Sequence, residues 1–268
     1  MTICRRVLLP LAAMLATGCV TQTNYDGPGP RYSGVVNGDA AAQNVPDTIR
    51  IVSYNIEFAF KVDSAIVVLA DPLLRNADIV LLQEMDAHGA ERIASALGMH
   101  HVYYPATKHM RTGRDFGNAV LSRWPIRSDA KILLPHLAAI GESRRIATAA
   151  TIEIGEMQIR VYSAHLGTVA NINADQRTEQ FETLLADAAP FDRVIIGGDM
   201  NDPDIGSVAR DRGYAWPTAR EPRTAKIGRL DHVFLKGLAP ARENGSGTIV
   251  DNHHASDHKP IWALAILR

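Results

Sequence analysis

The stretch GGDMND, residues 197–202, follows the apolar run RVII at residues 193–196. β-Branched residues bounded by glycines predict a short strand over residues 193–199. Asp199, Asn201 and Asp202 therefore bring three polar side chains to the end of that strand. An aspartate after two glycines has an ordinary explanation as a turn residue, so the stretch points to a site only if other strands end in the same way.

Short β-rich runs of the same kind recur from Asp47 onwards and alternate with stretches of helical spacing. The predicted strands cover residues 49–56, 78–84, 118–122, 147–154, 158–166, 193–199, 230–235 and 261–267. Helical spacing appears at residues 62–74, 90–97 and 172–188. This order predicts an α/β domain with two packed sheets and outer helices, although it does not fix how the strands pair.

Most of these strands carry polar residues at one end. They are Asn55, Glu84, His165, Asp199, Asn201, Asp231, Asp257 and His258. Each has an ordinary explanation when taken singly, such as a turn residue, an acid in the first turn of a helix or a histidine at a sheet edge. Their recurrence favours a site, because strand ends are where active sites gather in α/β domains.

The composition is that of an ordinary globular protein. Its 268 residues are 46% hydrophobic and 21% charged, which is enough apolar material for one large core. The formal net charge is −1, so no global basic field draws the chain to nucleic acid. An anionic substrate must therefore be held locally, by a metal ion or by a few placed cations.

The first 18 residues predict an export signal. Arg5 and Arg6 precede the apolar stretch at residues 7–16, which is too short to span a bilayer. LATGC at residues 15–19 resembles the lipobox of bacterial lipoproteins, which implies cleavage before Cys19 and a lipid on its sulfur. We then expect an exported protein, anchored to a membrane on the periplasmic or outer face of a bacterial envelope. An ordinary signal that leaves Cys19 as a free thiol is the alternative.

Residues 19–46 follow as the lipidated cysteine and a tether, and residues 47–268 form the predicted domain. The tether is rich in glycine, proline and small polar residues without periodicity, which is typical of a flexible coil with a span of roughly 30 Å. Cys4 and Cys19 are the only two cysteines, so the predicted domain contains no disulfide and no thiolate metal site.

Seven motifs in this order resemble the endonuclease/exonuclease/phosphatase superfamily. They are SYNI (53–56), QE (83–84), GNAVLSRWPI (117–126), SAHLG (163–167), GGDMND (197–202), RLDHVFL (229–235) and SDHKP (256–260). The resemblance covers about residues 49–267. It implies a four-layer sandwich of two packed mixed β-sheets flanked by helices, with a divalent ion at one end of the paired sheets.

The resemblance also implies how the polar residues divide their work. Glu84 is expected to be the main metal ligand, with Asn55 and Asp257 beside it, for Mg²⁺ or Mn²⁺, and oxygen ligands suit such ions. Asp199 is expected to orient or deprotonate the attacking water, with Asn201 facing the same site. His165 and His258 are expected to bind the phosphate, and Asp231 to hold His258 by a hydrogen bond. Asn118, and either Arg144 or Arg145, are expected as substrate-side or supporting polar groups.

The predicted activity is divalent-metal-dependent hydrolysis of a phosphodiester, of endonuclease-like type, by a monomer. DNA or RNA is the expected substrate, since cations at residues 108–114 and 220–229 flank motifs of the site. A solvated charge run explains those cations equally well. The alternatives are a phospholipid or inositol-phosphate phosphoesterase, similar to sphingomyelinases, and a non-catalytic lipoprotein that keeps the fold as a scaffold.

Overall fold

The computed structural model describes residues 23–35, 45–110, 112–242 and 245–267. Most of the described residues belong to two β-sheets, which pack face to face, or to the segments that connect their strands. Within these ranges no helix has the length and apolar character needed to cross a membrane. The predicted signal at residues 1–18 and the predicted lipid site at Cys19 lie outside the described residues.

The first sheet has the strand order β1-β5-β6-β4-β3-β14-β12, with β2 also on β5 and β13 also on β14. Its strands are β1 (Thr23–Asn24), β2 (Tyr32–Gly34), β3 (Thr48–Asn55), β4 (Ile79–Met85), β5 (His100–Lys108), β6 (Asp115–Ser122), β12 (Ala239–Pro240), β13 (Ser246–Thr248) and β14 (Ile261–Ile266). β3 and β4 are parallel, and β14 closes antiparallel on β3. The sheet is therefore mixed.

The second sheet has the order β11-β10-β9-β8-β7. Its strands are β7 (Ile126–Leu133), β8 (Ile146–Ile154), β9 (Met157–His165), β10 (Val194–Asp199) and β11 (Asp231–Lys236). β9 and β10 are parallel, whereas β11 runs antiparallel to β10. This sheet is mixed as well, as the superfamily resemblance implies.

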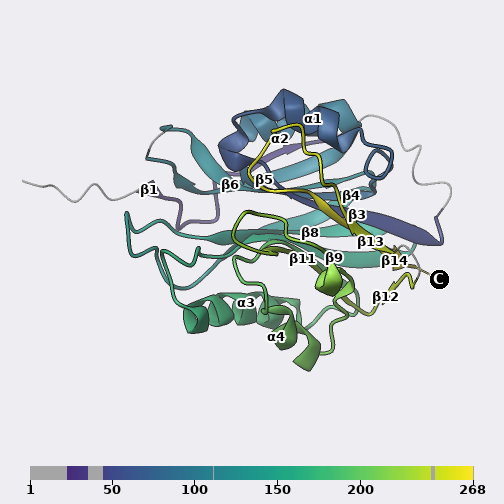
Figure 1. The fold of residues 1–268 in the computed structure, drawn as a ribbon. Coiled ribbons are helices and arrows are strands. Elements are labelled where there is room, and N and C mark those ends of the chain that lie inside the picture. The colour runs from purple at the N-terminus through teal and green to yellow at the C-terminus, as the bar shows by residue number, and fades with distance from the viewer. Residues whose placement is uncertain (1–22, 36–44, 111, 243–244, 268) are drawn as a thin grey trace, which may run out of the picture.

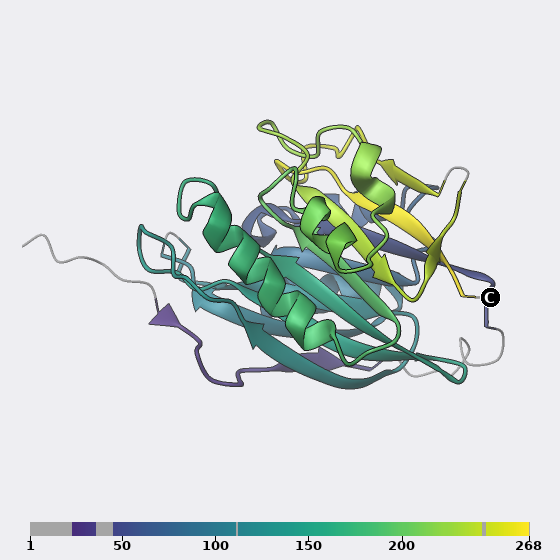
Figure 2. The ribbon, with the colours of Figure 1, turned by 90° about the horizontal axis from the view of Figure 1, so that it is seen from below.

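Helices cover the two outer faces. They are α1 (Val62–Leu69), α2 (Ala87–Leu97), α3 (Ala174–Ala188) and α4 (Gly206–Asp211), with 3-10 turns η2 (Glu57–Ala59) and η3 (Pro217–Arg220). Figure 1 shows α1 and α2 over the first sheet and α3 and α4 beneath the second, and Figure 2 shows α3 lying along the second sheet. The expected four-layer sandwich is confirmed.

Each interface between layers has its own apolar core. Val80 and Leu82 of β4 pack against α1 and α2, whereas Leu81 faces the second sheet, because successive residues of a strand point to opposite faces. Phe181 of α3 and Phe234 of β11 lie in the third interface, between the second sheet and its helices, with ring centroids 5.3 Å apart. Burial on both faces explains why the central strands are continuous apolar runs.

Two long strands of the structure, β5 and β7, are absent from the sequence prediction, as are the short strands β1, β2, β12 and β13 of two or three residues each. β5 contains Pro105, next to an irregularity in its pairing with β6, and proline lowers strand propensity. β7 is the edge of the second sheet, and its sequence IRSDAKIL is half polar and partly exposed. A strand that buries little apolar surface carries no periodic signal, so pairing partners decide its structure.

The N-terminal segment is a structural strap, not a free tether. β1 pairs with β5 through Thr23 and Lys108, and β2 pairs with β5 through Gly34 and His101. The prediction of a flexible tether over residues 19–46 is therefore wrong for residues 23–35; residues 19–22 and 36–44 are not described. Composition failed there because strands of two or three residues are held by main-chain bonds to β5, which need no side-chain periodicity.

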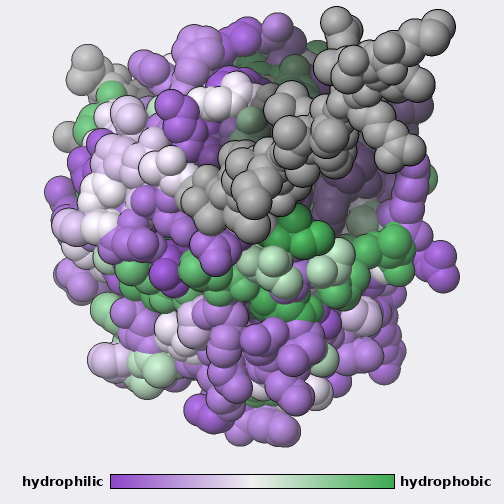
Figure 3. Space-filling model, turned by 90° about the vertical axis from the view of Figure 1, so that its left-hand side faces the viewer, coloured by the Kyte–Doolittle hydropathy of each residue, from purple (hydrophilic) through white to green (hydrophobic). Residues whose placement is uncertain are grey.

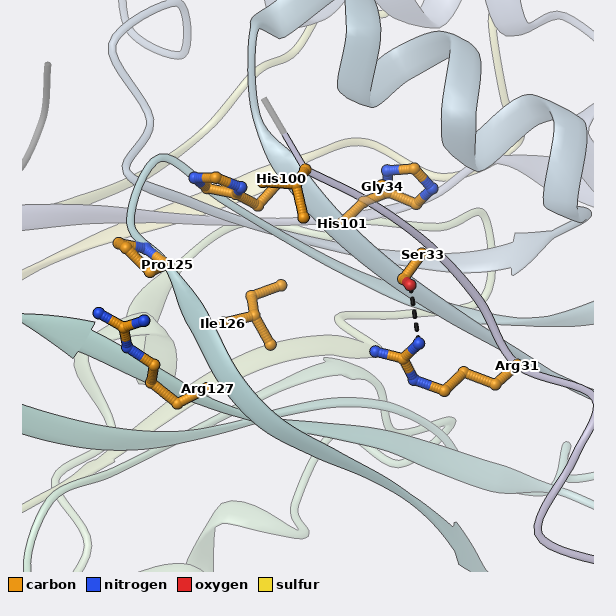
Figure 4. A pocket seen from close by; sticks show the side chains of 9 residues that line it. Arg31, Ser33, Gly34, His100, His101, Pro125, Ile126 and Arg127 are labelled. Carbon is orange, nitrogen blue, oxygen red and sulfur yellow. Dashed lines mark hydrogen bonds between the residues drawn. The ribbon is translucent and has the colours of Figure 1, made fainter. Parts of the chain in front are cut away.

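Arg31 ties this strap to the second sheet. Its guanidinium makes two 2.7 Å contacts with the carboxylate of Asp129 on β7 and donates to Ser33 Oγ at 2.7 Å. Figure 4 shows the latter bond in a small hollow whose wall also includes His100, at the start of β5, and Arg127, near the start of β7. The strap thus covers the β5 edge, where unpaired backbone would otherwise invite pairing with another chain.

Candidate active site

The strand ends bring the predicted site residues together at one end of the sandwich. In the second sheet, Asp199 of β10 stands opposite His165 of β9 on one side and opposite Asp231 of β11 on the other. In the first sheet, Asn55 ends β3 and pairs with Gln83, the residue before Glu84. Asn55 also spans the two sheets, because its amide nitrogen donates to Asp199 Oδ2 at 3.1 Å.

Glu84 is displaced from regular strand geometry towards this site. Its φ is 57° and the pairing of β4 with β6 shifts register between Leu82 and Met85. Its Oε1 accepts from the Asn55 amide at 3.2 Å and its Oε2 from the Phe58 main-chain N–H at 3.1 Å. A left-handed conformation is costly for glutamate, and bulges near active sites re-aim side chains.

A left-handed turn holds Phe58 over Glu84. Glu57, Phe58 and Ala59 have φ values of 42°, 56° and 50°. Such residues cost roughly 1–2 kcal/mol each, so other contacts must hold the turn. Arg114 supplies one such contact. Its Nη2 donates to the Phe58 carbonyl at 2.7 Å, and its Nη1 donates to Asp86 Oδ2 at 2.6 Å.

Asp199 is a buried carboxyl with a pKa near neutrality. Burial has the largest effect on its pKa, which is raised to about 7. The charge of His258 lowers this pKa, and the charge of Asp231 raises it further. Its Oδ1 accepts the main-chain N–H of Asn201 at 2.9 Å. Gly198 makes the approach of β10 to β9 possible, since its φ is 150° and a Cβ there would lie 1.9 Å from the Ala164 carbonyl oxygen.

His258 and Asp231 form a buried pair. The His258 Nδ1–H donates to Asp231 Oδ2 at 2.8 Å, and His258 Nε2 lies 3.7 Å from Asp199 Oδ2. Burial disfavours the imidazolium, but Asp231 and Asp199 outweigh it and raise the pKa of His258 to about 11. His258 is therefore a cation at neutral pH, and its Nε2–H faces Asp199.

His165 differs from His258 in charge. Arg145 Nη1 lies 2.8 Å from His165 Nδ1 and 3.0 Å from Nε2. Burial, followed by the charges of Arg145 and His258, lowers the pKa of His165 well below its ordinary value. The ring is neutral, so Arg145 carries the positive charge on this side of the site. From the sequence, either Arg144 or Arg145 is expected as a substrate-side or supporting group.

Two sets of side chains in the site contain ligand types for a divalent cation. Asp199, Asp231 and His258 have ligand atoms within 4.8 Å of one another. Because His258 is protonated and already bonded to Asp231, this group is better described as an acid–imidazolium pair than as a metal cage. Glu84 fits a hard cation better, since its side chain is only 15% exposed and desolvation raises its pKa, an energetic cost that a bound cation would relieve.

The other predicted metal ligands fit less completely. Asn55 turns its amide nitrogen towards Glu84 and Asp199, while its oxygen accepts from Glu57 N at 3.1 Å. The amide would have to rotate to offer oxygen to a cation. Asp257 is exposed at the mouth of the same hollow as Glu84. Their metal-binding roles stay predictions.

Asn201 and Asn118 hold the framework. Asn201 has a φ of 50° and donates from its amide to the Leu166 carbonyl at 3.1 Å, which links the loops after β9 and β10. Asn118 donates to the carbonyls of Ile146 and Ser163, so it joins the two sheets behind the site. Arg144 bonds Asp26 of the strap instead of facing the site.

Two adjoining hollows open at this end, each of about 410 Å³. They share Glu84, Thr168 and Ala170. The catalytic hollow is lined further by His165, Val169, Asp199, Asn201, Ala225, Lys226, Ile227, Leu230, Asp257 and His258. The aromatic hollow is lined further by Phe58, Thr107, His109, Phe116, Ile140, Ser143, Arg145 and Asn171.

Several residues that hold the site gave no sequence signal of their role. Ser256 Oγ donates to the Asn55 carbonyl at 2.7 Å and accepts the His258 N–H, which anchors the SDHKP turn. Thr224 Oγ1 accepts the N–H of Leu230 and of Asp231 at 3.0 and 3.2 Å. Only the serine of SDHKP lay within a recognised motif; short polar side chains are frequent in turns, so sequence alone does not single them out.

The fold and this carboxylate–imidazole cluster define a phosphoesterase-type α/β sandwich. Residues 36–258 match the model of the Endonuclease/Exonuclease/phosphatase family, and the chain belongs to that family. Family members are generally hydrolases that act on phosphate esters. No curated protein matches this chain.

Solved structures share the fold. An endonuclease/exonuclease/phosphatase from Beutenbergia cavernae has a TM-score of 0.68 and 18% identity, over 83% of this chain and 72% of that one. A relative from Bacteroides vulgatus has a TM-score of 0.67 and 14% identity, over 82% and 99%. D. rerio TDP2 complexed with single strand DNA product has a TM-score of 0.64 and 16% identity, over 82% and 99%.

Proposed function

We propose that this protein is a divalent-metal-dependent phosphodiesterase. The observation that carries the proposal is the convergence of Glu84, Asp199 and His258 on one hollow. Environment separates these groups into a largely enclosed carboxylate suited to a cation, a carboxyl with a pKa of about 7, and an imidazole whose pKa of about 11 keeps it protonated at neutral pH. Groups with such different environments in one cleft are typical of acid–base catalysis.

The division of chemical work follows from the geometry. Asp199 accepts the proton of the water that attacks phosphorus, because its pKa lies near the working pH. The His258 Nε2–H donates to a non-bridging phosphate oxygen, where negative charge develops. Asp231 keeps that ring protonated and oriented. Glu84, with Asn55 and Asp257, would hold Mg²⁺ or Mn²⁺, which would neutralise the phosphate when bound.

Metal dependence and the Glu84→Gln variant test this activity together. We expect hydrolysis of a soluble chromogenic phosphodiester with Mg²⁺ or Mn²⁺, none in excess chelator, and a loss of several orders of magnitude in turnover for Glu84→Gln. Glu91→Gln, on the exposed side of α2, is the matched control and should leave turnover unchanged. Full activity in chelator would exclude the metal mechanism, and no hydrolysis of any phosphate ester would favour the scaffold alternative.

Nucleic acid is the first substrate candidate. D. rerio TDP2, a structural neighbour, is complexed with single strand DNA product. Lys226 lines the catalytic hollow, which supports contact with an additional phosphate. Arg114, one of the cations expected to bind substrate, is instead bonded to Asp86 and to the Phe58 carbonyl. The flanking cations thus offer fewer phosphate contacts than their number in the sequence suggested.

A phospholipid is the second candidate, favoured by the apolar side chains around the cleft. Ile140, Val169 and Ile227 are exposed on the lips of the two hollows. Single- and double-stranded DNA, RNA, phospholipid vesicles and inositol phosphates, each assayed with the metal that supports the chromogenic ester, distinguish the candidates. Loss of the preferred hydrolysis in Glu84→Gln would assign it to this site.

A further inference from the structure

Exposed apolar side chains occur on loops at the end of the molecule where the two hollows open. Phe60, Met110, Ile140, Val169 and Ile227, here called the apolar rim, belong to five separate connections between elements. Ile140 is 76% exposed, Ile227 69% and Val169 57%. Figure 3 shows an apolar band across this end of the molecule. Large apolar residues at the tips of several loops are unusual on a soluble surface and mark an interaction site.

The apolar rim is continuous with the candidate active site. Val169 and Ile227 line the catalytic hollow, and Ile140 lines the aromatic hollow, which shares Glu84 with it. Whatever covers the rim therefore lies directly over Glu84 and His258. A large protein partner there would close the hollow, whereas a lipid surface would present phosphodiester head groups to it.

The first described strand, β1, lies at the same end of the molecule as the rim. Thr23 of β1 pairs with Lys108, the last residue of β5, two residues before Met110 of the rim. Three residues separate Thr23 from Cys19. Because an extended chain spans at most about 3.6 Å per residue, four residues of chain reach no farther than about 14 Å from Thr23. A lipid on Cys19 would thus enter a membrane beside the rim, not at the end of a long tether.

We propose that the apolar rim seats on a phospholipid bilayer, with the catalytic hollow facing the lipid head groups. Side chains such as Ile227 and Val169 lose exposed apolar area when they enter the acyl boundary, which stabilises the seated state. Lys226, next to Ile227, stands where its ammonium group can reach lipid phosphates. Membrane seating does not depend on the proposed hydrolysis, but it favours the phospholipid candidate over a long nucleic acid.

Depth-dependent quenching of tryptophan fluorescence tests the seating. Ile227→Trp and Val169→Trp place the probe on the rim, and Val67→Trp is the matched control, because Val67 is 58% exposed on α1, away from the hollow. Each full-length variant is bound to phosphatidylcholine–phosphatidylglycerol vesicles with brominated acyl chains. Signals are corrected for the parent chain, which has three tryptophans.

We expect strong bromine quenching at positions 227 and 169 and none at position 67. Equal quenching at all three positions, or none on the rim of vesicle-bound protein, would overturn the seating. Because an anchor alone would hold the protein on vesicles without bringing the rim to the lipid, the local probe separates the two contributions.

Serine substitutions give a second measurement with the anchor removed. In the Cys19→Ser background, Ile227→Ser and Val169→Ser should each weaken vesicle binding by roughly tenfold, whereas Val67→Ser should not. Hydrolysis of a soluble phosphodiester is measured for all three variants, and it should remain unchanged in Val67→Ser, because Val67 lies on α1. If binding is unaffected by the rim variants while soluble hydrolysis persists, the seating is wrong and the proposed activity stands; if no variant or parent hydrolyses any ester, the activity is wrong and the binding result still decides the seating.

Discussion

Asp231 controls the charge of the site, although it does not face the catalytic hollow itself. It is fully buried, and among the described residues its Oδ1 has no hydrogen-bond partner, so its charge is directed at His258 through Oδ2. Removing that charge would leave Asp199 and Asp257 alone to oppose burial, so the pKa of His258 would fall. Asp231 therefore makes the largest contribution to the imidazolium at neutral pH.

We expect Asp231→Asn to lower kcat on a soluble phosphodiester by about 10²- to 10⁴-fold at pH 8. The activity requires protonated His258 and is lost as the pH rises through the pKa of that ring. Since this pKa falls in the variant, its remaining activity should be lost on the alkaline side at a lower pH than in the parent. A pH–rate profile measures both effects. Asp251→Asn, an exposed carboxylate near His253, is the control. A variant profile that keeps the parent's alkaline limit would show that Asp231 does not set the charge of His258.

Gly198 lies where the backbones of β10 and β9 leave no space for a side chain. At φ 150°, a Cβ would meet the Ala164 carbonyl oxygen at 1.9 Å, and both atoms belong to paired strands that cannot move apart freely. We expect Gly198→Ala to lower the free energy of unfolding by about 3 kcal/mol or more, as measured by urea denaturation. Gly27→Ala, where no atom lies within 4 Å, should change it little. Equal stability of the two variants would contradict the close approach of β10 to β9.

At the residue scale, sequence predicted which polar groups meet but not how they are charged. Asn55, Glu84, Asp199 and His258 lie at strand ends, and strand ends converge in a parallel arrangement. Charge depends on burial and on neighbours from other elements. His165 shows this, since burial is the main cause of its lowered pKa and the charge of Arg145 adds to it. No local pattern contains that information.

At the element scale, the strap is the feature that composition missed. Asn24 holds the β7–β8 connection by two bonds: its amide nitrogen donates to the Glu142 carbonyl at 2.8 Å, and its oxygen accepts the Arg144 N–H at 2.8 Å. Arg145, which follows directly, reaches His165. The strap therefore supports the connection that carries Arg145 into the site.

We expect Asn24→Ala to loosen this connection. Two lost hydrogen bonds correspond to about 1–3 kcal/mol, so hydrogen exchange at residues 134–145 should accelerate by roughly tenfold or more, with a smaller fall in kcat/KM. Ser33→Ala, at the other end of the strap, removes the bond from Arg31 and should leave exchange at residues 134–145 unchanged. Unchanged exchange in Asn24→Ala would show that β7 and β8 alone order the connection.

At the scale of the whole molecule, the two-sheet core was predictable because the central strands are buried on both faces and read as apolar runs. The same core encloses His232, which is fully buried on β11. Its Nδ1 accepts the Trp216 indole N–H at 3.3 Å, so its Nε2 carries the proton and donates to the Asp202 carbonyl at 3.0 Å. Only the neutral tautomer with its proton on Nε2 makes both of these bonds.

His232 should therefore make the stability of the fold depend on pH. Burial lowers its pKa from 6.5 to about 4, with opposing contributions from Asp202 and Asp231. Between these values the unfolded chain binds a proton that the folded chain does not. The stabilisation is thus complete above pH 6.5 and is lost as pH falls towards 4, by about 3 kcal/mol for this group.

Urea denaturation at pH 7.0, 5.5 and 4.5 should show a smaller loss of unfolding free energy in His232→Gln than in the parent, because glutamine does not titrate. His101 and His165 also have lowered pKa values caused by burial, so both proteins should still lose stability on acidification. The difference between the two slopes isolates His232, whatever the replacement costs at neutral pH. Parallel slopes would mean that His232 takes up a proton at the same pH in the folded protein as in the unfolded chain. A protonated ring would contradict the bond that Nδ1 accepts from Trp216.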